Sequence, residues 1–155
     1  LLNKDININH KFKRGLHWIK KLGGSQILYL IKDSKSNEIL CERLFINKKD
    51  RKILSEYKLF KSKIENNEEK YKHFSASNWT AFIEDNNLNP ETIKLLISES
   101  ILFWRELLRW LFIYRFIKSN KSGKTLKEEG WEEGKKIGDE IKRLRYINID
   151  NYSKN

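Results

Sequence analysis

The spacing of apolar residues constrains the fold of this chain more than any other feature. Apolar side chains recur three or four positions apart, which is the period of a helix face. The alternation of apolar and polar residues that is typical of half-buried strands is nearly absent, and only one proline interrupts the pattern. The sequence therefore predicts an all-α fold: a compact multi-helix bundle of short and medium helices with no significant sheet.

Capping residues and glycines divide this pattern into helices. Residues 12–22 form the first predicted helix, which Gly23 and Gly24 end. Residues 25–32 are short and apolar; a strand is the alternative there, but no partner strand exists, so a helix is favoured. Residues 37–45 predict another short helix. Further starts are indicated by polar capping residues, namely Asn47, Ser75 or Ser77, and Asn89 before Pro90.

The longer segments predict the domain organisation. The polar residues 66–73 mark a boundary between a helical body-like region, 1–66, and a helical C-terminal RNA-binding region, 67–155. Residues 99–118 are apolar nearly all round, which predicts one helix at the centre of the bundle.

The net charge of +11 indicates a polyanionic partner such as RNA, DNA or an acidic membrane surface. Part of the lysine excess has another explanation, a codon bias toward A and T. The longest apolar run, residues 107–117, is interrupted by Arg109 and Arg115 and is too short to span a membrane. The composition therefore predicts a cytoplasmic protein without a membrane partner.

The sequence predicts no catalytic residue, no metal site and no cofactor. His10, His17 and His73 are scattered, without ligand partners at metal-binding spacing. There is no phosphate-binding glycine loop and no pair of aspartates on a predicted strand to hold Mg²⁺. Whether the chain belongs to an enzyme is left open.

Basic residues next to aromatic ones are the strongest indication of a binding site. Arg105 and Arg109 lie one helical turn apart beside Trp110, an arrangement that suits phosphate pairing and base stacking. The alternative is that both arginines bond inside the protein, to helix-end carbonyls or to Glu106 and Glu128.

The C-terminal segment predicts a second basic site around a glycine-bounded turn. Thr125 starts a one-turn helix that Gly130 ends, with Glu128 completing a capping box, and Gly134 opens the next helix. Gly138 sits one turn inside it, at a cost of about 1 kcal/mol against alanine. Either a close helix approach or access of a phosphate to the amides would explain it; tight helix packing alone is the alternative. The cations predicted here to bind RNA backbone are Lys135, Lys136, Lys142, Arg143 and Arg145.

Residues 126–150 resemble the C-terminal motif of the class II tRNA nucleotidyltransferases, the bacterial CCA-adding enzymes and their poly(A) polymerase relatives. Residues 42–50 are similar to the body region of that family. One position departs from the family's turn, because Lys135 stands where the family has proline. The matching residues of the turn and its helix are Gly130, Trp131, Gly134, Ile137, Gly138, Ile141, Leu144 and Ile149.

The resemblance implies a helical body and tail that clamp the acceptor and T arms of tRNA. It also implies an N-terminal catalytic domain of the same polypeptide, expected before Leu1 because the chain starts without methionine. That head would use Mg²⁺ with CTP and ATP to add CCA, and none of its catalytic residues has a counterpart here.

Two other functions stay open from the sequence. A helical protein-interaction module would present an apolar groove lined by Trp79, Trp104 and Trp110, with its arginines paired internally. A helix-turn-helix DNA regulator would need base-reading residues at a helix start, where Glu91 instead places an acid.

Overall fold

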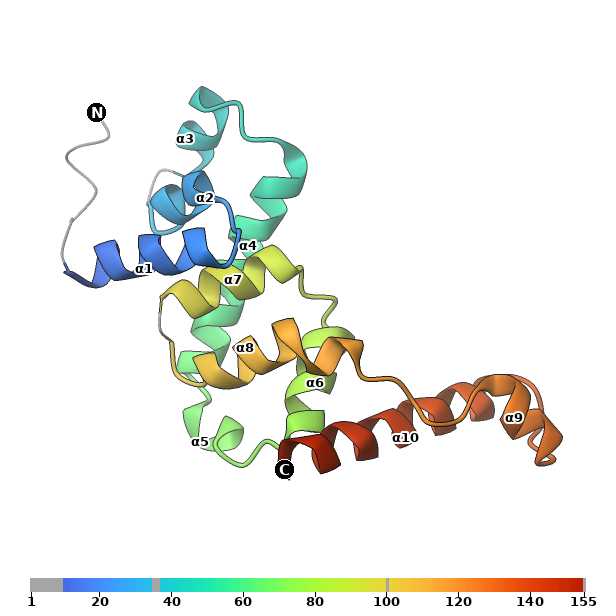
Figure 1. The fold of residues 1–155 in the computed structure, drawn as a ribbon. Helices are drawn as coiled ribbons and strands as arrows, with labels where there is room; N and C mark the ends of the chain where they lie inside the picture. The colour runs from blue at the N-terminus through green and yellow to red at the C-terminus, as the bar shows by residue number, and fades with distance from the viewer. Residues whose placement is uncertain (1–9, 35–36, 100, 155) are drawn as a thin grey trace.

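The structure is a computed structural model that describes residues 10–34, 37–99 and 101–154 (Figure 1). These residues form helices and connecting segments and contain no strand, which confirms the predicted all-α fold. The helices are α1 (His10–Lys21), α2 (Gln26–Ile31), α3 (Asn37–Arg43), α4 (Lys48–Glu65), α5 (Glu68–Tyr71), α6 (Ala76–Asp85), α7 (Pro90–Ser98), α8 (Trp104–Phe112), the 3₁₀ helix η1 (Tyr114–Phe116), α9 (Gly123–Glu128) and α10 (Lys135–Lys154).

Side-chain caps start several of these helices. Asn47 accepts a hydrogen bond from the Asp50 amide, and Ser75 accepts one from the Asn78 amide. Asn89 likewise caps α7. Ser25 caps α2, so the ambiguous residues 25–32 form a helix, as favoured from the sequence. Each cap satisfies an amide that has no partner within its helix.

Helix α7 lies at the centre of the molecule and packs against α1, α4 and α8. Its residues from Thr92 to Ser98 are buried, apart from Lys94. Gly15 allows α1 to approach closely: a Cβ at this position would lie 2.8 Å from the Ser98 carbonyl oxygen. Because Gly15 packs toward α7, the opposite side of α1 faces the solvent.

The prediction of one helix over residues 99–118 is wrong. Helix α7 ends at Ser98, α8 begins at Trp104, and the chain leaves α8 through the short η1. Phe103 has a left-handed backbone with φ of 67°, which a continuous helix does not allow. Its ring packs against Trp79 with the two ring centroids 5.2 Å apart. This contact holds the turn and determines the direction in which α8 starts.

An aromatic cluster lies where the sequence placed a boundary. Tyr71 is buried and contacts the rings of Phe74, Trp79 and Phe82. One hydrophobic core takes residues from Ile19 through Ile149, so both predicted regions contribute to it. The division into 1–66 and 67–155 stays a prediction.

A network of polar contacts around the buried Lys32 joins the ends of α2 and α7 to α4. Lys32 is 3% exposed, and its ammonium pairs with Glu99 at 2.8 Å and with Asp33. The Tyr57 hydroxyl lies 3.4 Å from an Asp33 carboxylate oxygen. Burial, and then the charge of Asp33, raise the pKa of the fully buried Tyr57.

Helix α10 begins away from the body and ends against it (Figure 1). Its first turns lie beside α9, and its C-terminal part packs on α6. Ile149 is completely buried, and the Asp150 carboxylate accepts hydrogen bonds from the Ser77 amide and hydroxyl at 2.8 and 2.7 Å. None of the helices in the described ranges has the length and apolar composition needed to cross a bilayer.

Candidate nucleic-acid interface

Carboxylates of the protein engage five of the seven cations predicted to bind RNA. Three of these pairs lie within one helix or at its start, so they follow helical spacing. The pairs are Arg109 with Glu106 at 3.0 Å, Lys136 with Glu132 at 3.0 Å, Arg143 with Glu140 at 2.7 Å, Lys142 with Asp85 at 2.7 Å, and Arg145 with Glu84 at 2.6 Å. RNA contact by these residues stays a prediction, and RNA would compete with an internal carboxylate at each of them.

Arg145 is the most firmly engaged of the five. Its guanidinium holds both carboxylate oxygens of Glu84 and also donates to the carbonyls of Ile117 and Tyr114. Its side chain is only 20% exposed. Arg145 therefore joins α10 to α6 and to the end of η1, which is a structural role.

The glycine-bounded turn is present, but no other helix packs closely against Gly138. Gly130 and Gly134 have φ of 89° and 120°, values that side chains strongly disfavour. At Gly138 an added Cβ would meet nothing within 4 Å, so no helix approaches closely there. Its amide donates to the Gly134 carbonyl at 3.5 Å and is therefore not free for a phosphate. The close helix approach expected at Gly138 is therefore wrong, whereas access of a phosphate to the other amides of this helix start stays a prediction.

The predicted capping box of α9 is also wrong. Ser122 is the cap, and its hydroxyl accepts a hydrogen bond from the Thr125 amide at 3.2 Å. The helix consequently starts at Gly123, before the predicted start at Thr125. Glu128 instead lies 4.0 Å from Lys124.

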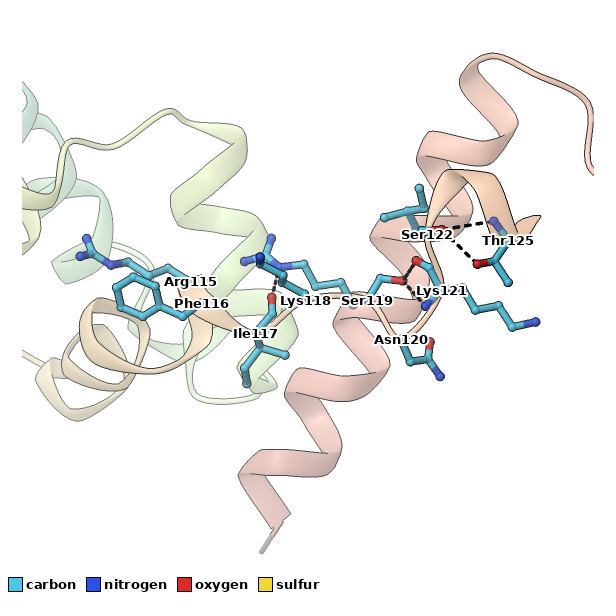
Figure 2. Close-up of a pocket in the computed structure, with 11 residues that line it drawn as sticks. Arg115, Phe116, Ile117, Lys118, Ser119, Asn120, Lys121, Ser122 and Thr125 are labelled. Atoms are coloured by element: carbon cyan, nitrogen blue, oxygen red, sulfur yellow. Dashed lines mark hydrogen bonds between the residues drawn. The ribbon is translucent and has the colours of Figure 1, made fainter. Parts of the chain in front are cut away.

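A pocket of about 670 Å³ lies between residues 115–122 and α10 (Figure 2). Figure 2 shows the Ser119 hydroxyl bonded to the backbone of Lys121, which closes a tight turn. Lys121 is paired with Glu129, but Arg115 and Lys118 contact no carboxylate among the described residues. This pocket is thus lined by two cations without an acidic partner.

The C-terminal and N-terminal segments differ in net charge. Residues 123–154 contain eight Lys and Arg against seven Asp and Glu. Residues 10–32 contain six Lys and Arg and no Asp or Glu. The N-terminal segment is therefore more strongly positive than the C-terminal one.

The solvent-facing side of α1 carries cations that lack acidic partners. Among the described residues, no carboxylate lies within ion-pair distance of Lys13, Arg14, Lys20 or Lys21. Only Lys11 approaches an acid, Glu99, at 3.9 Å. The four unpaired side chains are exposed, and at helical spacing they share the face opposite Gly15 and Ile19.

Two tryptophans adjoin this basic face. The rings of Trp18 on α1 and Trp104 on α8 are inclined by 47° with centroids 6.3 Å apart. With Arg14 and Ile97 they line a pocket of about 210 Å³. The Arg105 guanidinium lies 5.5 Å from the Trp104 ring centroid. Among the cations predicted to bind RNA, Arg105 thus lies beside these tryptophans and the basic face of α1.

Sequence reasoning missed this surface, although a signal for it is present. Every charged residue between positions 6 and 32 is basic, but helical periodicity directs attention to the apolar face of this segment. The other two predicted tryptophans do not line a surface, because Trp79 and Trp110 are only 1% and 5% exposed. The groove expected for a protein-interaction module is therefore not formed by these three residues.

No family model, curated protein or solved structure matches this chain. Within the described residues, no group of three or more His, Cys, Asp or Glu side chains is arranged to hold a metal ion.

Proposed function

We propose that this chain binds nucleic acid and that the solvent-facing side of α1 contacts the phosphate backbone. RNA is the nucleic acid that the resemblance of residues 126–150 favours. The observation that carries the proposal is the set of unpaired cations on α1, Lys13, Arg14, Lys20 and Lys21, in a segment without acidic residues.

The charge pattern supports backbone contact because it is one-signed and exposed. Phosphates attract such a surface without reading the base sequence, and they release counterions when they bind. An internally paired cation contributes less, since the carboxylate beside it repels the phosphate. This difference favours α1 over the paired C-terminal cations, of which Arg143 and Lys136 are examples.

The test compares two variants with the same change in net charge. The first variant, on α1, has glutamine in place of Lys13, Arg14, Lys20 and Lys21. The second, on α10, has glutamine in place of Lys135, Lys136, Lys142 and Arg143. Glutamine keeps a similar helix propensity, so both variants should fold. Affinity for a fluorescent tRNA minihelix and for a single-stranded RNA is measured by anisotropy at several salt concentrations.

We expect the α1 variant to lose about tenfold or more in affinity at low salt, with a flatter salt dependence. The C-terminal variant should lose much less. For single-stranded RNA, neutralisation of four phosphates corresponds to a slope of roughly −3 in log K against log salt for the native chain. A larger loss in the C-terminal variant, or native binding that is indifferent to salt, contradicts the proposal.

A narrower function rests on the resemblance alone. In it the chain is the tRNA-clamping part of a CCA-adding nucleotidyltransferase in the cytoplasm, and an N-terminal domain supplies the catalysis. Preference of the native chain for a tRNA minihelix over an unrelated RNA hairpin of equal length supports this reading, and equal affinity counts against it.

A further inference from the structure

The two tryptophans beside the basic face have geometry that phosphate binding alone does not explain. Trp18 and Trp104 are both half-buried, and each keeps part of its ring on the wall of the 210 Å³ pocket. Trp104 also lines a second hollow of about 420 Å³, formed by residues 101–106. One ring therefore borders two adjoining hollows at the surface.

The fold holds these rings in place rather than leaving them to find a position. Helix α1 packs against α7 through Gly15, which sets the position of Trp18. Trp104 follows directly after the left-handed Phe103, whose own ring is packed against Trp79. A stacking surface that is already ordered loses little conformational entropy when a ligand binds.

Cations surround the rings without acidic partners. The Lys21 ammonium lies 5.9 Å from the Trp18 ring centroid, and Arg105 lies beside Trp104. Arg14 lines the pocket itself. No ion pair engages any of these three side chains within the described part of the chain. The arrangement of aromatic faces between unpaired cations matches a chain of alternating bases and phosphates.

From this arrangement we infer that Trp18 and Trp104 stack on unpaired bases, so that the chain prefers single-stranded nucleic acid. The inference rests on the proposed function of α1. A duplex buries its base faces in its own stack, and only an unstacked base can offer one to a tryptophan. The smaller pocket is below the roughly 300–1,000 Å³ of ordinary small-molecule sites, which favours one ring of a longer strand over a free cofactor.

The test uses three labelled ligands of equal length: a single strand, a duplex, and a single strand in which abasic sites replace the bases. RNA and DNA versions of the single strand distinguish the two sugars. Affinities are measured for the native chain, Trp18→Ala, Trp104→Ala and a control, Trp131→Ala, whose exposed ring lies before α10. Trp104→Phe is included because it keeps an aromatic face.

We expect each alanine substitution at Trp18 or Trp104 to weaken single-strand binding by about 5- to 150-fold, the range for loss of one base–aromatic stack. Binding of the duplex and of the abasic strand should stay unchanged, and Trp104→Phe should retain most of the affinity. The Trp131→Ala control should bind like the native chain. A variant that simply misfolds is recognised by its circular dichroism spectrum, independently of any binding measurement.

Equal losses for the normal and the abasic strand overturn the inference, as does single-strand binding that survives both alanine substitutions. The proposed function fails separately. If neutralisation of Lys13, Arg14, Lys20 and Lys21 leaves binding intact, these cations are not the phosphate contact, whatever the tryptophan variants show. If it abolishes binding of all three ligands while the tryptophan variants bind normally, backbone contact stands and base stacking is wrong.

Discussion

Gly15 and Gly138 both lie inside helices, yet the structure predicts opposite effects of replacing each by alanine. A Cβ at Gly15 would lie 2.8 Å from the Ser98 carbonyl oxygen and 2.6 Å from the Tyr29 Cζ atom, and closer still to the phenol oxygen. Tyr29 is only 1% exposed, so its ring cannot move aside into solvent. A Cβ at Gly138 would contact nothing within 4 Å.

The magnitudes follow from these surroundings. Alanine is favoured over glycine inside a helix by about 0.5–1 kcal/mol, and at Gly138 this is the whole effect. At Gly15 that gain is opposed by overpacking, which costs about 1–3 kcal/mol. The hydrogen bond from the Tyr29 hydroxyl to the Phe12 carbonyl is also lost, at about 1 kcal/mol. Gly15→Ala should therefore lower the free energy of unfolding by about 1–3 kcal/mol.

Urea and thermal unfolding followed by helical circular dichroism measure both effects. For a chain of this size 1 kcal/mol corresponds to about 2–4 °C in the midpoint. Gly138→Ala should raise the midpoint and Gly15→Ala should lower it. If Gly15→Ala is as stable as the native chain, the close packing of α1 on α7 is wrong. If Gly138→Ala is destabilising, this glycine has the packing role expected from the sequence.

Two further predictions concern buried polar contacts. Arg145→Met should lower the free energy of unfolding by about 1.5–3 kcal/mol, because it removes charged hydrogen bonds and leaves Glu84 without its cationic partner. Arg143→Met breaks an exposed pair and should cost much less, so equal losses in urea unfolding would contradict the buried role of Arg145. The raised pKa of Tyr57 means that its contribution to stability is complete below the unfolded value of about 10 and is lost at higher pH. Phenolate absorbance should therefore report a tyrosine that ionises only as the chain unfolds, and Tyr57→Phe should unfold at higher pH; an unchanged alkaline midpoint would refute this.

The helices were predictable because their signals are local. The caps Asn47 and Asn89 act within three residues of their own position, and the apolar stripes have the helical period. The break at Phe103 was not predictable, because its left-handed backbone is held by Trp79, a contact across 24 positions of sequence. The helical period of the apolar residues does not reveal a contact between residues so far apart in the sequence.

The candidate site was predicted poorly for a related reason. The sequence identifies each cation, but it identifies the carboxylate that pairs with a cation only when the two lie one helical turn apart. Glu140 and Arg143 are such a pair. Glu84 precedes Arg145 by 61 positions, so only the folded chain reveals that pair. The more useful signal was the absence of acids between Ile6 and Lys32, since a segment without carboxylates cannot neutralise itself.

The hydrogen bonds between Ser77 and Asp150 span 73 positions of sequence. Closing a loop of that length costs about 4 kcal/mol of chain entropy before any contact across it is gained. The pairs α4–α7 and α7–α8 close shorter loops, so α10 should dock after them, and Ile149 should enter the core late. During synthesis α6 would then present an uncovered apolar side until Ile149 and Asp150 have left the ribosome, which makes this face the point at which a newly made chain is most exposed to aggregation.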